Sequence, residues 1–108
     1  MTIPSPPETM LGALCVCEFH TAKFWAHKLG IKMTDMQFQN VVAKFATNEA
    51  TGWPKDLKEV TMDVLVSSDA DEKKFDELVK NVEAHCPVFI MFKKNTSNMN
   101  LRWKNKRA

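Results

Sequence analysis

The sequence contains no run of apolar residues long enough to cross a lipid bilayer. The longest such run, residues 10–17, falls far short of the ~20 residues that a spanning helix needs. The first ten residues contain three prolines and no positively charged leader, so they do not resemble a secretory signal peptide. Internal repeats and low-complexity segments are also missing. These absences argue against a membrane partner and favour a single domain over residues 1–108.

Cysteine is scarce, and its spacing fits neither a disulfide framework nor a structural zinc site. The three cysteines are Cys15, Cys17 and Cys86, an odd number without a Cys-x-x-Cys pair. On a helix, Cys15 lies about 200° around the axis from Cys17, so the two thiols point away from each other. We expect no metal and no cofactor. We also expect a reducing, cytoplasmic setting, in which cysteines seldom form structural disulfides.

Charge of one sign does not dominate either. The chain has 15 basic and 13 acidic side chains, which are interspersed and give a formal net charge of +2. Only residues 102–107 (RWKNKR) are locally basic, and a basic end is most often a solvated terminus. We therefore expect no nucleic-acid partner.

Residues 5–30 have the signals of a long helix. Ser5 can cap it, Pro6 suits its first turn, and Glu8 stands at the capping-box position. Gly30 supplies a left-handed residue at its end. Because residues 10–17 are apolar on all sides, we expect this helix to be central and buried on every side.

Two strands should follow the helix. Residues 32–47 alternate between apolar and polar side chains, and a change of phase near Asn40 indicates a bulge. Residues 48–56 contain Gly52 and Pro54 and are typical of a hairpin connection. The second strand has a clean period of two, with one apolar face made by Val60, Met62, Val64 and Val66.

The rest of the chain predicts two further helices and a last strand. A capping segment at residues 67–71 precedes an amphipathic helix whose apolar stripe contains Phe75, Leu78, Val79 and Val82. Cys86 falls on the same stripe and should point inward. Pro87 ends that helix and begins a short one over residues 87–93. Met99, Leu101 and Trp103 then alternate with polar residues as a strand.

This order of elements predicts an α+β fold in which a small antiparallel sheet and two further helices accompany the long central helix. Three strands are too few to bury a helix that is apolar all round. A second copy of the chain is the simplest cover, so we expect a homodimer.

Taken in order, these segments resemble the OsmC/Ohr family of osmotically inducible and organic hydroperoxide resistance proteins. A Ser-Pro-x-Glu start at residues 5–8 leads through the apolar run to Cys17, as in that family's central helix. A Lys-Leu-Gly-Ile end at residues 28–31, two strands, a Ser-Asp-Ala-Asp helix start and a His-Cys-Pro-Val junction at residues 85–88 follow in the family's order. The likeness runs from about residue 5 to residue 91.

The resemblance implies an intertwined OsmC-like dimer that reduces organic hydroperoxides through thiols. Cys17 holds the position of the family's peroxidatic cysteine and Cys86 that of its resolving cysteine, whereas Cys15 matches a position that is usually small. A sulfenic acid formed on Cys17 would be resolved by Cys86 as a disulfide. An external dithiol would then reduce that disulfide.

The resemblance also implies an N-terminally shortened relative, because the family's strands before the central helix have no counterpart in residues 1–4. In the family, that segment supplies the arginine that lowers the pKa of the peroxidatic thiol. Here the nearest groups that could activate a thiol are His20, one turn after Cys17, and His85, beside Cys86.

Two functions stay open on the sequence alone. The first is the thiol-dependent peroxidase. The second is a catalytically impaired OsmC-like protein, a dimeric binding or scaffold protein in which the cysteines serve as small buried hydrophobes.

Overall fold

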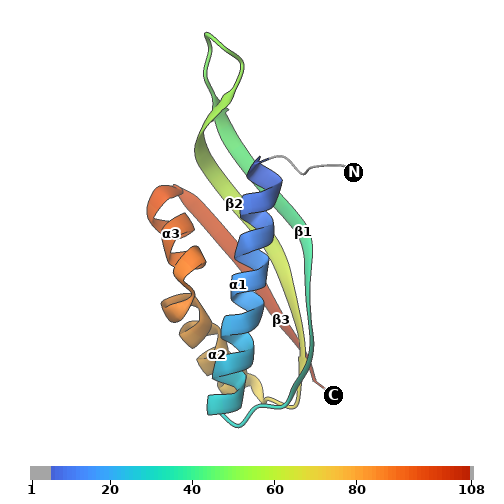
Figure 1. Ribbon diagram of the computed structural model, residues 1–108. Helices are drawn as coiled ribbons and strands as arrows, with labels where there is room; N and C mark the ends of the chain where they lie inside the picture. The colour runs from blue at the N-terminus through green and yellow to red at the C-terminus, as the bar shows by residue number, and fades with distance from the viewer. Residues whose placement is uncertain (1–5, 108) are drawn as a thin grey trace.

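The computed structural model describes residues 6–107, which fold into two layers, a sheet and the helices that cover one of its faces (Figure 1). In chain order, the elements are α1 (Pro6–Lys28), β1 (Met33–Thr47), β2 (Pro54–Ser68), α2 (Glu72–His85), α3 (Pro87–Asn95) and β3 (Asn98–Arg107). Each element expected from the sequence is present, which confirms the α+β class. The expected cap at Ser5 lies outside the described residues. Within these residues, no helix is both long and apolar enough to cross a membrane.

The sheet has the strand order β1-β2-β3, and it is mixed. β1 pairs with β2 in the antiparallel sense, but β3 pairs with β2 in the parallel sense. The prediction of an antiparallel sheet is therefore wrong for β3. The reason is the connection, since α2 and α3 together carry the chain back to the starting end of β2, and a crossover of that kind delivers a parallel strand.

The bulge predicted near Asn40 is confirmed. Asn40 has a positive φ of 52°, and the register between β1 and β2 shifts between Gln39 and Val42. The Asn40 amide Nδ2 donates to Asp63 Oδ2 across the pair at 2.7 Å. The β1–β2 hairpin extends past the ends of the helices, as Figure 1 shows.

The core lies between β2 and the helices. From Val60 to the end of β2 every second residue is fully buried, as the period of two predicts, and the apolar ones are Val60, Met62, Val64 and Val66. The apolar stripe of α2 meets them through Leu78 and Val82, both without exposed surface. Asp71 caps α2 by accepting from the Lys74 backbone N–H at 2.8 Å. Gly30 has a φ of 70°, which confirms the left-handed end of α1.

The single chain buries α1 on one face only, and cover of its other sides by a second copy stays a prediction. One face is buried, at the regular spacing of Leu14, Glu18, Ala22 and Ala26. On the rest of the helix, Met10 is 49% exposed, Val16 59% and Phe24 55%. A single sheet with two short helices covers α1 from one direction only, so an all-round apolar helix keeps a bare side.

Candidate functional site

The site is a pair of thiols that two distant parts of the chain bring into contact. The Cys86 thiol donates to Cys17 Sγ with the two sulfurs 3.0 Å apart, although 69 residues separate them in the sequence. Both cysteines are free thiols. Cys17 comes from the middle of α1 and is half-buried, and Cys86 is fully buried.

Cys86 occupies a joint between two helices. It is the C-cap of α2 and the N-cap of α3, with an extended backbone at φ −77° and ψ 110°. Its sulfur accepts from the Phe89 backbone N–H at 3.4 Å, and Pro87 holds the first position of α3. Because proline cannot continue α2 and is well placed to begin α3, the Cys-Pro sequence fixes the bend that points the thiol at α1.

Burial makes Cys86 a poor acid. Loss of hydration, and after it the hydrogen bond that its thiol donates to Cys17, raise the pKa of Cys86 to about 12. The carboxyl group of Glu18 adds to this rise, whereas the Phe89 N–H opposes it. Cys86 is therefore a protonated thiol at neutral pH, in keeping with its donor role.

Beside Cys17, the rim of a shallow hollow of about 320 Å³ is lined by His20, Thr21, Phe24, Trp25 and His85. Thr21 Oγ1 lies 3.9 Å from Cys17 Sγ, so this hollow begins next to the thiol pair.

The two histidines proposed to activate a thiol both line this hollow, and both are exposed. His85 Nδ1 lies 2.8 Å from the Asn81 carbonyl, and its ring stacks on Trp25 with centroids 4.7 Å apart. The ring of His20 meets Phe19 edge-on. Among the described residues, neither imidazole forms a hydrogen bond with Cys17 or Cys86, so their activating role stays a prediction.

Cys15 is not part of the pair. It is half-buried, and burial followed by the charge of Glu18 raises the pKa of its thiol. The contact of Cys17 with Cys86 leaves Cys15 without a place in the thiol pair.

Glu18 is a residue of the site that the sequence analysis missed. It has no exposed surface, and neither carboxyl oxygen has a hydrogen-bond partner within the described chain. Burial, and after it the charge of Glu83, raises the pKa of Glu18 to about 8. One signal was available, since Glu18 stands four residues after Leu14 and four before Ala22, on the stripe that the helix buries.

Neither arginine of the chain lies on the helices that carry the thiols. The chain has two arginines, Arg102 and Arg107, and both lie on β3. Arg102 pairs with Asp63, which alternates with the buried residues of β2 and so faces away from the helices. The described residues contain no group of three histidine, cysteine or acidic side chains that could hold a metal ion.

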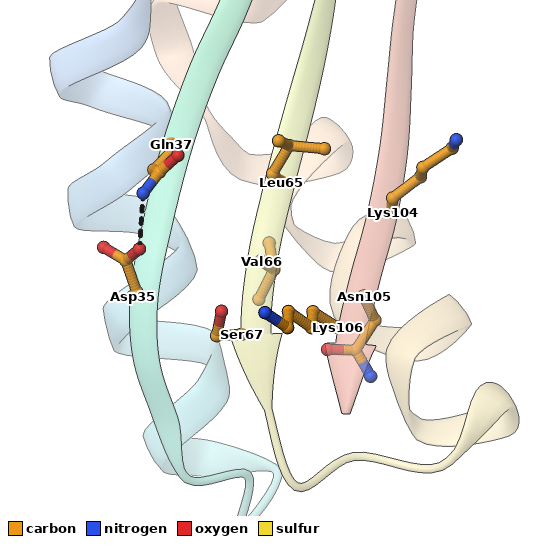
Figure 2. Close-up of a pocket in the computed structure, with 8 residues that line it drawn as sticks. All are labelled: Asp35, Gln37, Leu65, Val66, Ser67, Lys104, Asn105 and Lys106. Atoms are coloured by element: carbon orange, nitrogen blue, oxygen red, sulfur yellow. Dashed lines mark hydrogen bonds between the residues drawn. The ribbon is translucent and has the colours of Figure 1, made fainter. Parts of the chain in front are cut away.

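A second hollow of about 430 Å³ lies on the opposite face of the sheet. Its lining, drawn in Figure 2, consists of Asp35, Gln37, Leu65, Val66, Ser67, Lys104, Asn105 and Lys106. The helices that carry the thiols lie behind the strands in this view. Within the hollow, Gln37 Nε2 donates to Asp35 Oδ2 at 2.9 Å, so two of the polar lining residues are already paired with each other. The sheet lies between this hollow and the helices (Figure 2). This hollow is therefore separate from the thiol pair.

Comparison with known proteins gives one family and one fold. The family model described as OsmC-like protein matches residues 2–102. The OsmC-like protein of Mycoplasma pneumoniae is 21% identical with a TM-score of 0.81, over 97% of this chain and 74% of that one. OhrB of Bacillus subtilis, an organic hydroperoxide resistance protein, is 20% identical with a TM-score of 0.67, over 96% and 73% of the two chains. No curated protein matches the sequence.

Proposed function

Because the chain belongs to the OsmC-like protein family, we propose that it is a thiol-dependent peroxidase that reduces organic hydroperoxides. The observation that carries this proposal is the 3.0 Å separation of the Cys17 and Cys86 sulfurs. Two buried thiols that served only as small hydrophobes would have no need to face each other. A similar structure, OhrB, is named for resistance to organic hydroperoxides, and this supports the choice of substrate.

The roles of the two cysteines follow from their surroundings. Cys86 is fully buried and its thiol pKa of about 12 keeps it protonated, so it is a poor choice for the first attack on peroxide. Cys17 is half-buried beside the hollow, and its sulfur accepts a hydrogen bond from the Cys86 S–H. We therefore assign Cys17 as the peroxidatic thiol and Cys86 as the resolving thiol.

The reaction has two steps and one external reductant. The Cys17 thiolate attacks the outer oxygen of the hydroperoxide, the O–O bond breaks, and the departing alkoxide takes a proton to become an alcohol. The Cys86 sulfur then attacks Cys17 Sγ, its proton leaves with the hydroxyl group as water, and a disulfide forms. An external dithiol returns both cysteines to thiols, which suits a reducing cytoplasm.

The hollow beside Cys17 offers a place for the organic part of the substrate. Phe24 and Trp25 supply apolar surface there, while His20 and His85 are the titratable groups of its lining. We assign the two histidines to proton transfer at the departing alkoxide, a task that does not require contact with the sulfur itself.

We also propose a homodimer. Met10, Val16 and Phe24 give α1 a bare apolar side, and a second copy of the same helix is chemically matched to it.

A second candidate function is a dimeric binding or scaffold protein without peroxidase activity. The distribution of arginine favours it, because Arg102 is paired with Asp63 on the far face of the sheet and Arg107 lies on the same strand. A peroxidatic thiol without a fixed cation reacts slowly.

Thiol loss after addition of cumene hydroperoxide separates the two functions. We expect the wild-type protein to lose two thiols rapidly, and Cys17→Ser to react slower by about a hundredfold or more. Cys86→Ser should lose one thiol and accumulate a sulfenic acid that dimedone traps. Cys15→Ser is the matched control and should behave as wild type. If wild type and Cys17→Ser lose thiols equally slowly, the peroxidase assignment is wrong and the scaffold function stands.

A further inference from the structure

Glu18 is a buried carboxyl group to which the reaction above gives no task. It lies on the covered face of α1, has no exposed surface, and has no hydrogen-bond partner for either oxygen within residues 6–107. Buried polar groups in folded proteins nearly always have partners, so an exception of this kind calls for an explanation. The charge of Glu18 raises the pKa of the Cys86 thiol, so the carboxyl group lies near the thiol pair.

The groups that face Glu18 are acids, thiols and apolar side chains. Cys15 lies on the same helix, Glu83 comes from α2, and Cys86 comes from the joint between α2 and α3. Lys93 of α3 acts on Glu83. Apart from Ser68, the buried positions of the sheet beneath the helices are apolar, and they include Met36, Val60, Met62 and Val64. Within the described chain, therefore, no cation is placed to pair with an ionised Glu18.

A metal ion is the first explanation that two thiols and two carboxyl groups suggest. The geometry does not support it, because these side chains do not come together as a group of three possible ligands in the described residues. The remaining chemistry available to Glu18 is the gain and loss of a proton.

We propose that Glu18 is a positioning residue of the thiol pair, whose neutral carboxyl group beside Cys86 permits closure of the Cys17–Cys86 disulfide and whose ionisation opposes it. This inference rests on the redox pair of the proposed function, and it adds a group that decides when the pair can close.

The direction of the effect follows from electrostatics. Cys86 must lose its proton as it attacks Cys17 Sγ, and a negative charge nearby disfavours the thiolate. An ionised Glu18 accordingly raises the pKa of Cys86, whereas a neutral Glu18 does not. Thiol exchange normally speeds up as the pH rises, because more thiolate is present. Ionisation of Glu18 above about pH 8 should work against that increase.

Oxidised glutathione tests the closure step without any peroxide. Cys17 displaces one glutathione thiolate and becomes a mixed disulfide. Cys86 then gives up its proton and attacks Cys17 Sγ, which releases the second glutathione as the intramolecular disulfide forms. Glutathione disulfide is the oxidant and is reduced to two thiols. Mass spectrometry of acid-quenched samples counts the mixed and the intramolecular disulfide between pH 6.5 and 9.

The informative variant is Glu18→Gln, which keeps the shape of the side chain and removes its charge. We expect it to close the disulfide about three- to tenfold faster than wild type at pH 9, where Glu18 of the wild type is ionised, and at the same rate at pH 6.5. Asp76→Asn, which removes an exposed acid of α2, is the matched control and should follow wild type throughout. Identical pH profiles for Glu18→Gln and wild type, or slower closure by Glu18→Gln at every pH, would overturn the proposal.

A second measurement needs no substitution at Glu18. Carbon-13 resonances of the Glu18 side-chain carboxyl group in the wild-type protein report its ionisation directly. Titration well above pH 6 supports the proposal, and titration near the ordinary pKa of a glutamate overturns it. The peroxide test fails separately: if hydroperoxide leaves Cys17 untouched while the glutathione profiles differ as expected, the proposed function is wrong and the role of Glu18 stands.

Discussion

The two sides of α1 invert the usual arrangement of a surface helix. The covered side, which contains Leu14, Glu18 and Ala22, includes an acid without exposed surface. The bare side presents Met10, Val16 and Phe24, three large apolar side chains at about half exposure. In an ordinary amphipathic helix, the acid would be outside and the large apolar residues inside. The covered side therefore holds the buried acid that we propose acts on the thiol pair, and the bare side is the surface that we assign to a second copy.

The largest expected effect concerns the packing of the covered side of α1 against the core. Leu14 is fully buried against the core, so Leu14→Ala should lower the free energy of unfolding by about 3 kcal/mol. Val16→Ala is the matched control two residues along, and its effect on unfolding of the monomer should stay within about 0.5 kcal/mol. Urea denaturation at low protein concentration gives both values. Equal losses for the two variants would mean that α1 does not have a covered and a bare side.

A smaller effect concerns the ionisation of Glu18 on the covered side, which makes the stability of the fold depend on pH. The pKa of Glu18 is raised from 4.5 to about 8 in the folded protein. Between these two pH values the folded state therefore holds a proton that the unfolded chain has already released. The stabilisation from that proton is complete below the unfolded pKa of about 4.5 and is lost as the pH rises to about 8.

Relative to Glu18→Gln, the wild-type protein should therefore lose about 1 kcal/mol of stability for each pH unit between 5 and 7. Parallel urea titrations of the two proteins at each pH isolate Glu18 from the other carboxylates. A constant difference between them would show that Glu18 keeps an ordinary pKa in the folded state.

The smallest effect concerns the bare side. Phe24→Ser removes an exposed aromatic ring that the proposed dimer would bury, and we expect about tenfold weaker self-association, equivalent to about 1.4 kcal/mol. Sedimentation equilibrium measures the association, and Thr51→Ala in the exposed hairpin turn is the control. A wild-type protein that remains monomeric at high concentration would contradict the homodimer and leave the bare side of α1 for another partner.

Most of the fold could be predicted because its signals are local. The alternation in β2, the cap at Asp71, the break at Pro87 and the left-handed Gly30 each act within a few residues of themselves. The direction of β3 could not be predicted this way, since it depends on the path of the two helices across the sheet. The exposure of Val16 could not be predicted from the sequence pattern either, because the pattern does not show whether an apolar residue is covered by its own chain or by another.

The thiol site was only partly predictable. The inward direction of Cys86 followed from the apolar stripe of α2, but its contact with Cys17 joins residues too far apart for spacing to reveal. The resemblance to the OsmC/Ohr family supplied that pairing. Glu18 escaped notice because a lone acid in an apolar segment is normally expected on the solvent side, and only its four-residue spacing from Leu14 and Ala22 pointed inward.

The distance along the chain between Cys17 and Cys86 has a consequence for the topology of the molecule. A bond between their sulfurs would close residues 17–86 into a covalent ring that contains β1, β2 and α2 entire. The native fold would change little, because the sulfurs are already in contact, whereas the denatured chain would lose much of its freedom. Oxidation and reduction of the thiol pair would thus switch the chain between a linear polymer and a closed loop, and urea unfolding with and without reductant would measure the difference in chain entropy.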